Sequence, residues 1–235
     1  MCTSLIYRNP ERKLLGLGFN RDESIKRKPA DPPHSYEENG IKVLAPADGD
    51  QGGTWIGINS DGEIYALLNL YEAQLKLIQY PTSRGFLVRR LLEKKYNTSE
   101  LNEKSLEKFY PFRLVRAGAD RTEVFSWNGE YLENWEDSSE WLVLGSSFML
   151  GAEAEKIRRK NFEENYKNQH TDFFSAAAAF LTSHLPEKGP KSPCMHRRDA
   201  HTVSQTLILK SEKETVMKYK SMQPCETEVF QEIVF

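Results

Sequence analysis

The sequence predicts an α+β fold, in which strands come first, helices follow and strands return at the end. The turn sequence Asn59-Ser60-Asp61-Gly62 separates two extended apolar runs and is a strong hairpin signal. Apolar residues recur with helical periodicity over residues 84–96. Residues 202–209 return to the β-branched and apolar composition of a strand. This order favours two antiparallel sheets covered by helices.

The remaining elements follow from the same signals, taken in order along the chain. Strands are expected at residues 3–7, 13–19, 41–45, 54–58, 63–68, 112–117, 123–127, 141–144, 202–209, 214–219 and 228–234. Helices are expected at residues 84–96, 99–109, 150–168 and 172–184, with Ser83 as the N-cap of the first. The polar, proline-rich segment 24–40 is expected to be a long surface loop.

Composition excludes several classes of protein. A chain of 235 residues can bury a substantial core without disulfides. Its net charge of −2 gives no sign of nucleic-acid binding, and no apolar run is long enough to span a membrane. The first residues lack the features of a secretion signal, and the odd cysteine count argues for a reducing compartment. We therefore expect a single cytoplasmic domain over residues 1–235, with the oligomeric state left open.

Cys2 is the most informative single residue. It follows the initiator Met1, and a small residue at position 2 normally permits removal of that methionine. Removal would leave one residue with both a thiol, of pKa about 8.5, and an α-amine, of pKa about 8. The amine can then act as general base for its own side chain, a known form of covalent catalysis. For Cys2 taken alone, an ordinary strand residue is the alternative.

A polar run, Asn20-Arg21-Asp22-Glu23, ends the second predicted strand. Antiparallel pairing of the first two strands would return this run towards Cys2. The Asp22 carboxylate could orient the α-amine, the Arg21 cation favours thiolate, and the Asn20 amide could bind a substrate carbonyl. A charged turn at the end of a strand is the alternative interpretation.

With these residues in place, the chain resembles the NRDE family, also called the transport and Golgi organisation protein 2 family. The chain begins Met-Cys, as that family does, and Asn20-Arg21-Asp22-Glu23 is the tetrapeptide that names it. The further matches are Gly52-Gly53-Thr54-Trp55-Ile56-Gly57, Asn69 at the end of a strand, and Arg84-Gly85 at the start of a helix.

This family is similar to N-terminal-nucleophile (Ntn) hydrolases with an N-terminal cysteine, such as penicillin V acylases and bile salt hydrolases. The resemblance implies their four-layer αββα sandwich. Those enzymes have a catalytic arginine where this chain has Phe19, and an oxyanion-hole asparagine in the region of Ser147. We expect catalytic roles for Cys2, Asn20, Asp22 and Asn69, and substrate-binding roles for Arg21, Trp55, Arg84 and Ser147.

A second polar cluster lies in residues 194–204. Its Cys194, His196 and His201 could ligate zinc, but no second Cys or His pair follows at standard spacing. We therefore expect no metal and no cofactor. Thr202 or the neighbouring arginines could instead line the site and hold a carboxylate or phosphate, and a solvated basic loop is the simpler alternative.

Two classes of function remain. In the first, the chain is an enzyme, an Ntn-type amidohydrolase or acyltransferase, and Cys2 attacks the carbonyl of a small or linear amide. In the second, the same fold is not catalytic and binds or carries an acyl-CoA, another lipid or haem, as the family resemblance also implies. Retention of Met1 would separate the two, because it blocks the amine. We expect hydrolysis of carbon–nitrogen bonds, with a small-molecule amide or acyl-bearing ligand as the partner.

Overall fold

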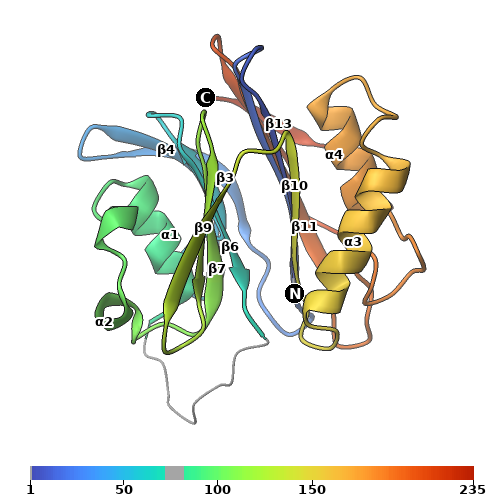
Figure 1. Cartoon of the computed structure of the whole chain (residues 1–235), viewed down its shortest axis with the longest axis horizontal. Coiled ribbons are helices and arrows are strands. Elements are labelled where there is room, and N and C mark those ends of the chain that lie inside the picture. Colours follow the sequence, from blue (N-terminus) through green and yellow to red (C-terminus); the bar gives the residue numbers. More distant parts are fainter. Residues whose placement is uncertain (1, 72–81) are drawn as a thin grey trace. The chain divides into compact units, whose positions relative to one another are not determined.

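The computed structural model describes residues 2–71 and 82–235, and the chain divides into two compact units. Unit 1 joins the two ends of the chain, Met1–Arg27 and Ser139–Phe235, and unit 2 is Lys28–Ser138. Each unit contains one antiparallel sheet with helices beside it (Figure 1). The α+β class with two antiparallel sheets is therefore confirmed. The expectation of a single domain over residues 1–235 stays a prediction.

The sheet of unit 1 is built around the N-terminal hairpin. Its strand order is β10-β1-β2-β11-β12-β13. The strands are β1 (Cys2–Asn9), β2 (Leu14–Ser24), β10 (Trp141–Ser146), β11 (Ala200–Lys210), β12 (Thr215–Lys220) and β13 (Gln231–Val234). Because β1 and β2 are central, the first residues of the chain are flanked on both sides by paired strands.

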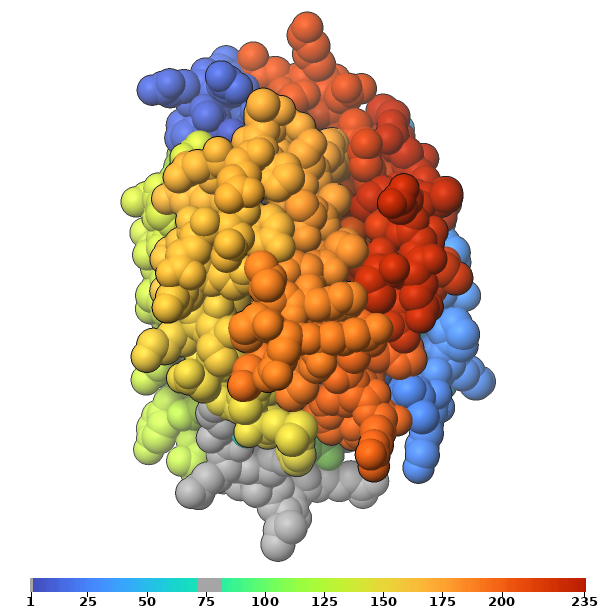
Figure 2. All heavy atoms as spheres, turned by 90° about the vertical axis from the view of Figure 1, so that its right-hand side faces the viewer, coloured from blue at the N-terminus to red at the C-terminus, as the bar shows by residue number. Residues whose placement is uncertain are grey.

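Two helices, α3 (Ala152–Asn165) and α4 (Phe173–Thr182), cover one face of this sheet; Figure 2 shows them as the gold and orange segments of that face. Glycines of β2 let α4 approach closely. A Cβ on Gly16 would lie 2.8 Å from the Phe173 ring, and one on Gly18 would lie 2.8 Å from Leu181. Ala177 adds a small side chain on the helix side of the same contact, as expected for the alanines of this helix. The buried core here is Leu5, Tyr7, Val143, Phe162, Phe173, Ala177, Phe180, Leu181 and Leu207.

The sheet of unit 2 runs in chain order, β3-β4-β5-β6-β7-β8-β9. The strands are β3 (Asp31–Glu38), β4 (Ile41–Ala47), β5 (Ile56–Asn59), β6 (Ile64–Asn69), β7 (Phe112–Ala117), β8 (Thr122–Trp127) and β9 (Leu132–Asp137). The predicted hairpin at residues 59–62 joins β5 to β6, with Gly62 at a φ of 78°. Helix α1 (Arg84–Leu92) packs on this sheet and buries Leu87, Val88, Leu91 and Leu92 in its core.

Two predictions of secondary structure are wrong, and both concern edge strands. Segment 24–40 is not a continuous loop, because it contains β3 at one edge of the sheet. Prolines are tolerated there, since an edge strand needs only half of its backbone N–H groups for pairing. The other edge strand, β9, is exposed and polar along most of its length and shows no apolar alternation.

All four predicted helices are shorter than expected, and the first two differ most in proportion to their predicted length. Helix α1 ends at Leu92, and Lys94 beyond it has a φ of 55°. The segment 99–109 forms only the 3-10 turn η1 (Thr98–Glu100) and the short α2 (Glu103–Leu106). Ser83 is the N-cap of α1, although its side chain makes no capping hydrogen bond. None of the helices in the described part of the chain has the length and apolar character needed to cross a bilayer.

Candidate active site

Strand pairing places Cys2 in a row of four side chains across the sheet of unit 1. Cys2 lies opposite Ser146 of β10 on one side and opposite Arg21 of β2 on the other, and Arg21 lies opposite Ser204 of β11. Directly paired residues point to the same face of a sheet, so these four share a face. All four are buried. The Ser146 and Ser204 hydroxyls are buried and have no hydrogen-bond partner among residues 2–71 and 82–235.

Asp22 is the next residue along β2 and points to the opposite, helix-covered face. Because Arg21 pairs with Cys2, Asp22 lies one residue further along β2, level with the start of β1. Its Oδ1 accepts a hydrogen bond of 2.6 Å from the Thr202 hydroxyl. Its Oδ2 is buried and has no partner in the described part of the chain. A buried carboxylate oxygen near the start of β1 therefore has no hydrogen-bond partner among the described residues.

Arg158 of α3 is the functional candidate that sequence reasoning missed. Its side chain is fully buried, and one guanidinium nitrogen donates to the backbone carbonyl of Cys2 at 3.1 Å. The other two nitrogens donate to the carbonyls of Pro190 and Lys191. The sequence feature that could have identified Arg158 is its spacing. It lies four residues from both Ala154 and Phe162, on the buried stripe of α3.

Burial and charge oppose one another in this site. Burial raises the pKa of the Cys2 thiol, and the Asp22 carboxylate raises it further. Burial also raises the pKa of the Asp22 carboxyl, while Arg158 and the Thr202 hydroxyl act to lower it. The pKa of the Arg158 guanidinium is lowered by burial, against the negative charges of Asp22 and Cys2. The thiol consequently needs a base to become a nucleophile at neutral pH.

Asn20 lies two residues before Asp22, on the same helix-covered face. Its amide nitrogen donates to the carbonyls of Leu181, at 2.6 Å, and Pro193, at 2.9 Å. Its Oδ1 accepts a bond of 3.4 Å from Gln205. Both amide hydrogens are thus used within the protein, so Asn20 fixes the loop after α4 to β2 and has no hydrogen left for an oxyanion.

Ser147 follows β10 and is also buried, but its hydroxyl accepts a hydrogen bond from the Leu150 N–H in the turn that leads to α3. The residue that pairs with Cys2 is its neighbour Ser146. The structure therefore brings Cys2, Arg21 and Ser146 together on one face of the sheet, and it places Asp22 and Asn20 on the other face.

The remaining predicted residues belong to unit 2. Asn69 ends β6 and its amide donates to the Tyr71 hydroxyl at 2.7 Å. Arg84 begins α1 and donates to the carbonyl of Pro111 at 2.9 Å. Trp55 is buried just before β5, and its carbonyl accepts a bond from Leu67.

Two of the sequence motifs meet within unit 2. A Cβ on Gly53 would lie 2.6 Å from the backbone of Gly85, and the Thr54 N–H donates to the Gly85 carbonyl at 3.1 Å. The Gly52 N–H donates to Asp48 at 2.8 Å. Gly53 and Gly85 therefore allow a close approach of two backbone segments, whereas Gly52 supplies a positive φ of 68°.

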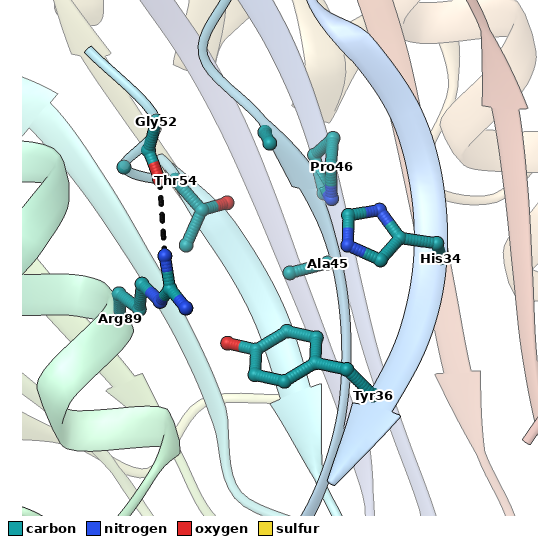
Figure 3. A pocket seen from close by; sticks show the side chains of 9 residues that line it. His34, Tyr36, Ala45, Pro46, Gly52, Thr54 and Arg89 are labelled. Carbon is teal, nitrogen blue, oxygen red and sulfur yellow. Dashed lines mark hydrogen bonds between the residues drawn. The ribbon is translucent and has the colours of Figure 1, made fainter. Parts of the chain in front are cut away.

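Unit 2 also contains a pocket of about 220 Å³ between β3, β4 and α1 (Figure 3). Arg89 lies on one side of it and donates to the Gly52 carbonyl, while His34 and Tyr36 lie on the other side. Burial and the nearby Glu93 carboxylate raise the pKa of Tyr36 to about 12. None of the predicted catalytic residues lines this pocket.

One group of side chains in unit 1 has the composition of a metal site. His184, Cys194, His196 and Cys225 place their ligand atoms within 4.8 Å of one another. Burial lowers the pKa of His196 to about 4 and raises that of Cys194 to about 12. Of the three residues considered from the sequence, Cys194 and His196 belong to this group, and His201 does not.

Comparison with solved structures finds the same fold in Ntn hydrolases. An N-acylethanolamine-hydrolyzing acid amidase ortholog from Caenorhabditis elegans matches with a TM-score of 0.58 and 12% identity, over 88% of this chain and 92% of that chain. Two variants of conjugated bile acid hydrolase from Clostridium perfringens match with a TM-score of 0.52 and 12% identity, over 99% of this chain and 92% of theirs. At this identity the likeness shows the fold, and the predicted Ntn-hydrolase type is confirmed. No curated protein sequence matches the chain.

The family is shown by the sequence itself. The model of the family described as Transport and Golgi organisation 2 matches residues 1–221. That match extends well beyond the N-terminal motifs and includes all of the predicted catalytic and substrate-binding residues. The chain therefore belongs to the Transport and Golgi organisation 2 family.

Proposed function

We propose that the chain is an N-terminal cysteine amidohydrolase that acts after removal of Met1. The observation that carries the proposal is the buried Asp22 Oδ2, which lacks a hydrogen-bond partner among the described residues and belongs to the residue that follows Arg21, the strand partner of Cys2. A buried carboxylate oxygen without a partner is costly unless a cation or donor joins it. The α-ammonium of a mature Cys2 is such a group and would be supplied by the chain itself.

The chemistry requires one nucleophile and one base. The α-amine of Cys2 removes the thiol proton, and Sγ attacks the amide carbonyl to form a tetrahedral oxyanion. Collapse forms a thioester and breaks the C–N bond, with the proton transferred from the ammonium to the leaving amine. Water, activated by the same amine, then hydrolyses the thioester and restores the thiol.

The surrounding residues would act by positioning and by charge. Asp22 orients the ammonium, and Thr202 orients Asp22 through their 2.6 Å hydrogen bond. Arg158 holds the Cys2 carbonyl and offsets the negative charge that develops. The hydroxyl of Ser146 lies in the same row as Cys2 and is a candidate donor to the oxyanion. The expectation that Asn69 donates there, and that Arg21, Trp55, Arg84 and Ser147 contact substrate, remains part of this proposal.

The substrate class follows from the chemistry of the neighbours. One structural neighbour is named for hydrolysis of N-acylethanolamines and another for conjugated bile acids. A thiol nucleophile with an amine base suits amides of this type, in which an acyl group is joined to a small amine.

The test is the intact mass of the protein purified from its native host, before and after reaction with a thiol-reactive acyl probe. Loss of Met1 and stoichiometric labelling at Cys2, located by peptide mapping, are expected. The Cys2→Ala variant is the matched control and should lose that label while keeping its fold. A panel of N-acyl amides then identifies the substrate by release of the free amine.

Retention of Met1 together with an unlabelled Cys2 would overturn the proposal. The second candidate is then a binding role for an acyl-CoA, another lipid or haem, and one observation favours it. Cys2 exposes only 7% of its surface, and burial raises the pKa of its thiol. Titration of the same preparation with each ligand, followed by fluorescence or absorbance, would then decide which of them binds.

A further inference from the structure

A second cluster of chemically reactive side chains lies in unit 1, apart from the proposed catalytic chemistry. Three separate segments supply it. His184 follows α4, Cys194 and His196 lie in the connection before β11, and Cys225 lies in the 3-10 turn η2 (Pro224–Glu226). Cys194 is buried and the other three are half-buried. Their ligand atoms lie within 4.8 Å of one another.

The distances within the cluster match a tetrahedral coordination shell. Zinc–nitrogen and zinc–sulfur bonds of about 2.05 Å and 2.3 Å place nitrogen and sulfur ligands about 3.5 Å apart and two nitrogens about 3.3 Å apart. The Sγ atoms of Cys194 and Cys225 lie 3.6 Å and 3.5 Å from His196 Nε2. His184 Nε2 lies 3.0 Å from the same atom. The other three pairs of ligand atoms lie within 4.8 Å, so all four ligands surround a space that one ion could occupy after side-chain adjustment.

We propose that unit 1 holds a structural Zn²⁺ ion, bound by His184, Cys194, His196 and Cys225. Two thiolates and two neutral imidazoles form a common zinc ligand set, and two thiolates balance the charge of the ion, so the bound site is neutral. Four protein ligands leave no open position for water or substrate. The site is therefore structural, and it does not depend on the proposed hydrolase activity.

The backbone around the ligands is held before any metal binds. The Cys194 N–H donates to the Ser183 carbonyl at 3.1 Å, and the Ser192 hydroxyl donates to the Cys194 carbonyl at 2.6 Å. The His196 N–H donates to Gly189 at 3.2 Å. These bonds fix the loop that carries two ligands.

The turn that carries Cys225 is fixed in a similar way. Lys220 at the end of β12 donates to the carbonyls of Pro224 and Thr227, which flank this turn, at 3.1 Å and 2.7 Å. Zinc would thus join segments that are already close, namely the loop after α4 and the turn after β12.

The metal loop also supports the residues beside Cys2. Pro193, the residue before Cys194, accepts from Asn20, and the Met195 N–H between the two loop ligands donates to the Thr202 hydroxyl at 2.8 Å. Thr202 in turn donates to Asp22. A zinc ion would therefore stiffen the backbone that positions Asn20 and Asp22, without touching either of them.

The test measures metal directly in the full chain. Protein expressed with zinc and purified under reducing conditions should carry one equivalent of zinc by inductively coupled plasma mass spectrometry. Protein grown with cobalt instead should show the intense visible d–d absorption of a tetrahedral ion and thiolate-to-cobalt charge transfer. This second measurement needs no variant and is therefore independent of any folding defect.

Variants identify the ligands. Cys225→Ser and His184→Ala should lose the zinc and the cobalt spectrum, whereas His201→Ala, which changes a histidine at the start of β11 outside the cluster, should keep both. A metal-free wild type without a tetrahedral cobalt spectrum would overturn the proposal. So would a Cys194–Cys225 disulfide in non-reducing peptide maps of freshly purified protein, or retention of zinc by both ligand variants.

Discussion

The Thr202 hydroxyl joins Asp22 to the loop that precedes β11, because it donates to Asp22 Oδ1 at 2.6 Å and accepts from the Met195 N–H at 2.8 Å. All three groups are buried. This hydroxyl is a hydrogen-bond partner of one oxygen of the Asp22 carboxylate, and the other oxygen is buried without a partner among the described residues. The position of Asp22 thus depends on one side chain from a strand far along the chain.

Thr202→Val is therefore expected to destabilise the fold by about 2 kcal/mol, because it leaves a buried carboxylate oxygen and a backbone N–H unpaired. Thr202→Ser keeps the hydroxyl and is expected to recover most of this loss. Chemical denaturation of both variants measures the difference. Equal stability of the two would show that the hydroxyl bond contributes nothing.

Arg158→Met is expected to lower the free energy of unfolding by about 3 kcal/mol, since the buried carbonyls of Cys2, Pro190 and Lys191 would lose their donor. Arg159→Met is the matched control. Its side chain is 46% exposed and pairs with Glu155 in a surface ion pair, so its loss should change stability by less than about 1 kcal/mol. Similar effects from the two substitutions would contradict the role assigned to Arg158.

Asp22→Asn should change how stability depends on pH. Burial raises the folded pKa of Asp22 above the unfolded value of about 3.9. The folded chain therefore holds the proton more tightly, and this contribution to stability is present below the unfolded pKa and is lost as pH rises through the folded pKa. Between acid and neutral pH, protein that retains Met1 should lose stability relative to Asp22→Asn. Denaturant midpoints of both proteins across this pH range test the sign of the difference. Parallel curves of midpoint against pH for the two proteins would contradict the prediction.

Asp22→Asn also separates stability from catalysis. The amide cannot pair electrostatically with an α-ammonium, so the processed variant should lose most of its acyl-probe labelling at Cys2 while remaining folded. Undiminished labelling would mean that Asp22 does not position the amine.

Gly53→Ala is expected to destabilise the protein by about 3 kcal/mol, because the added Cβ would meet the backbone of Gly85 at 2.6 Å and neither segment can move freely. Gly189→Ala is the control, since a Cβ there meets nothing within 4 Å. Thermal unfolding of both variants gives the comparison. A Gly53→Ala variant with unchanged stability would show that the two backbone segments separate easily.

The N-terminal hairpin could be predicted from the sequence because its pairing is local. A turn at Asn9-Pro10 separates two β-rich runs, so the approach of Asp22 to Cys2 followed from counting residues along two adjacent strands. The strands β3 and β9 could not be predicted in this way. Their side chains face solvent at the sheet edges, so no apolar alternation marks them.

The rest of the site depends on contacts between distant segments. Arg158 lies on a helix that composition marks as charged and exposed, and only its place on the buried stripe distinguishes it from Arg159. The cluster of His184, Cys194, His196 and Cys225 lacks regular spacing, because its ligands come from a helix end, a loop and a turn that the tertiary fold brings together. Single-sequence periodicity carries no information on such encounters.

Because of the register shift in β11, the geometry of this site depends on how many residues the strand contains as well as on which residues they are. Thr202 pairs with Asp22 and Ser204 with Arg21, so Val203 is an extra residue in the ladder. In a regular strand Thr202 and Ser204 would share a face, but the inserted residue sends one hydroxyl to each side of the sheet. Deletion of Val203 would keep every polar side chain named above. It would nevertheless remove either the Thr202 or the Ser204 hydroxyl from its face of the sheet. The length of this strand is accordingly under as strict a constraint as the identity of its hydroxyls.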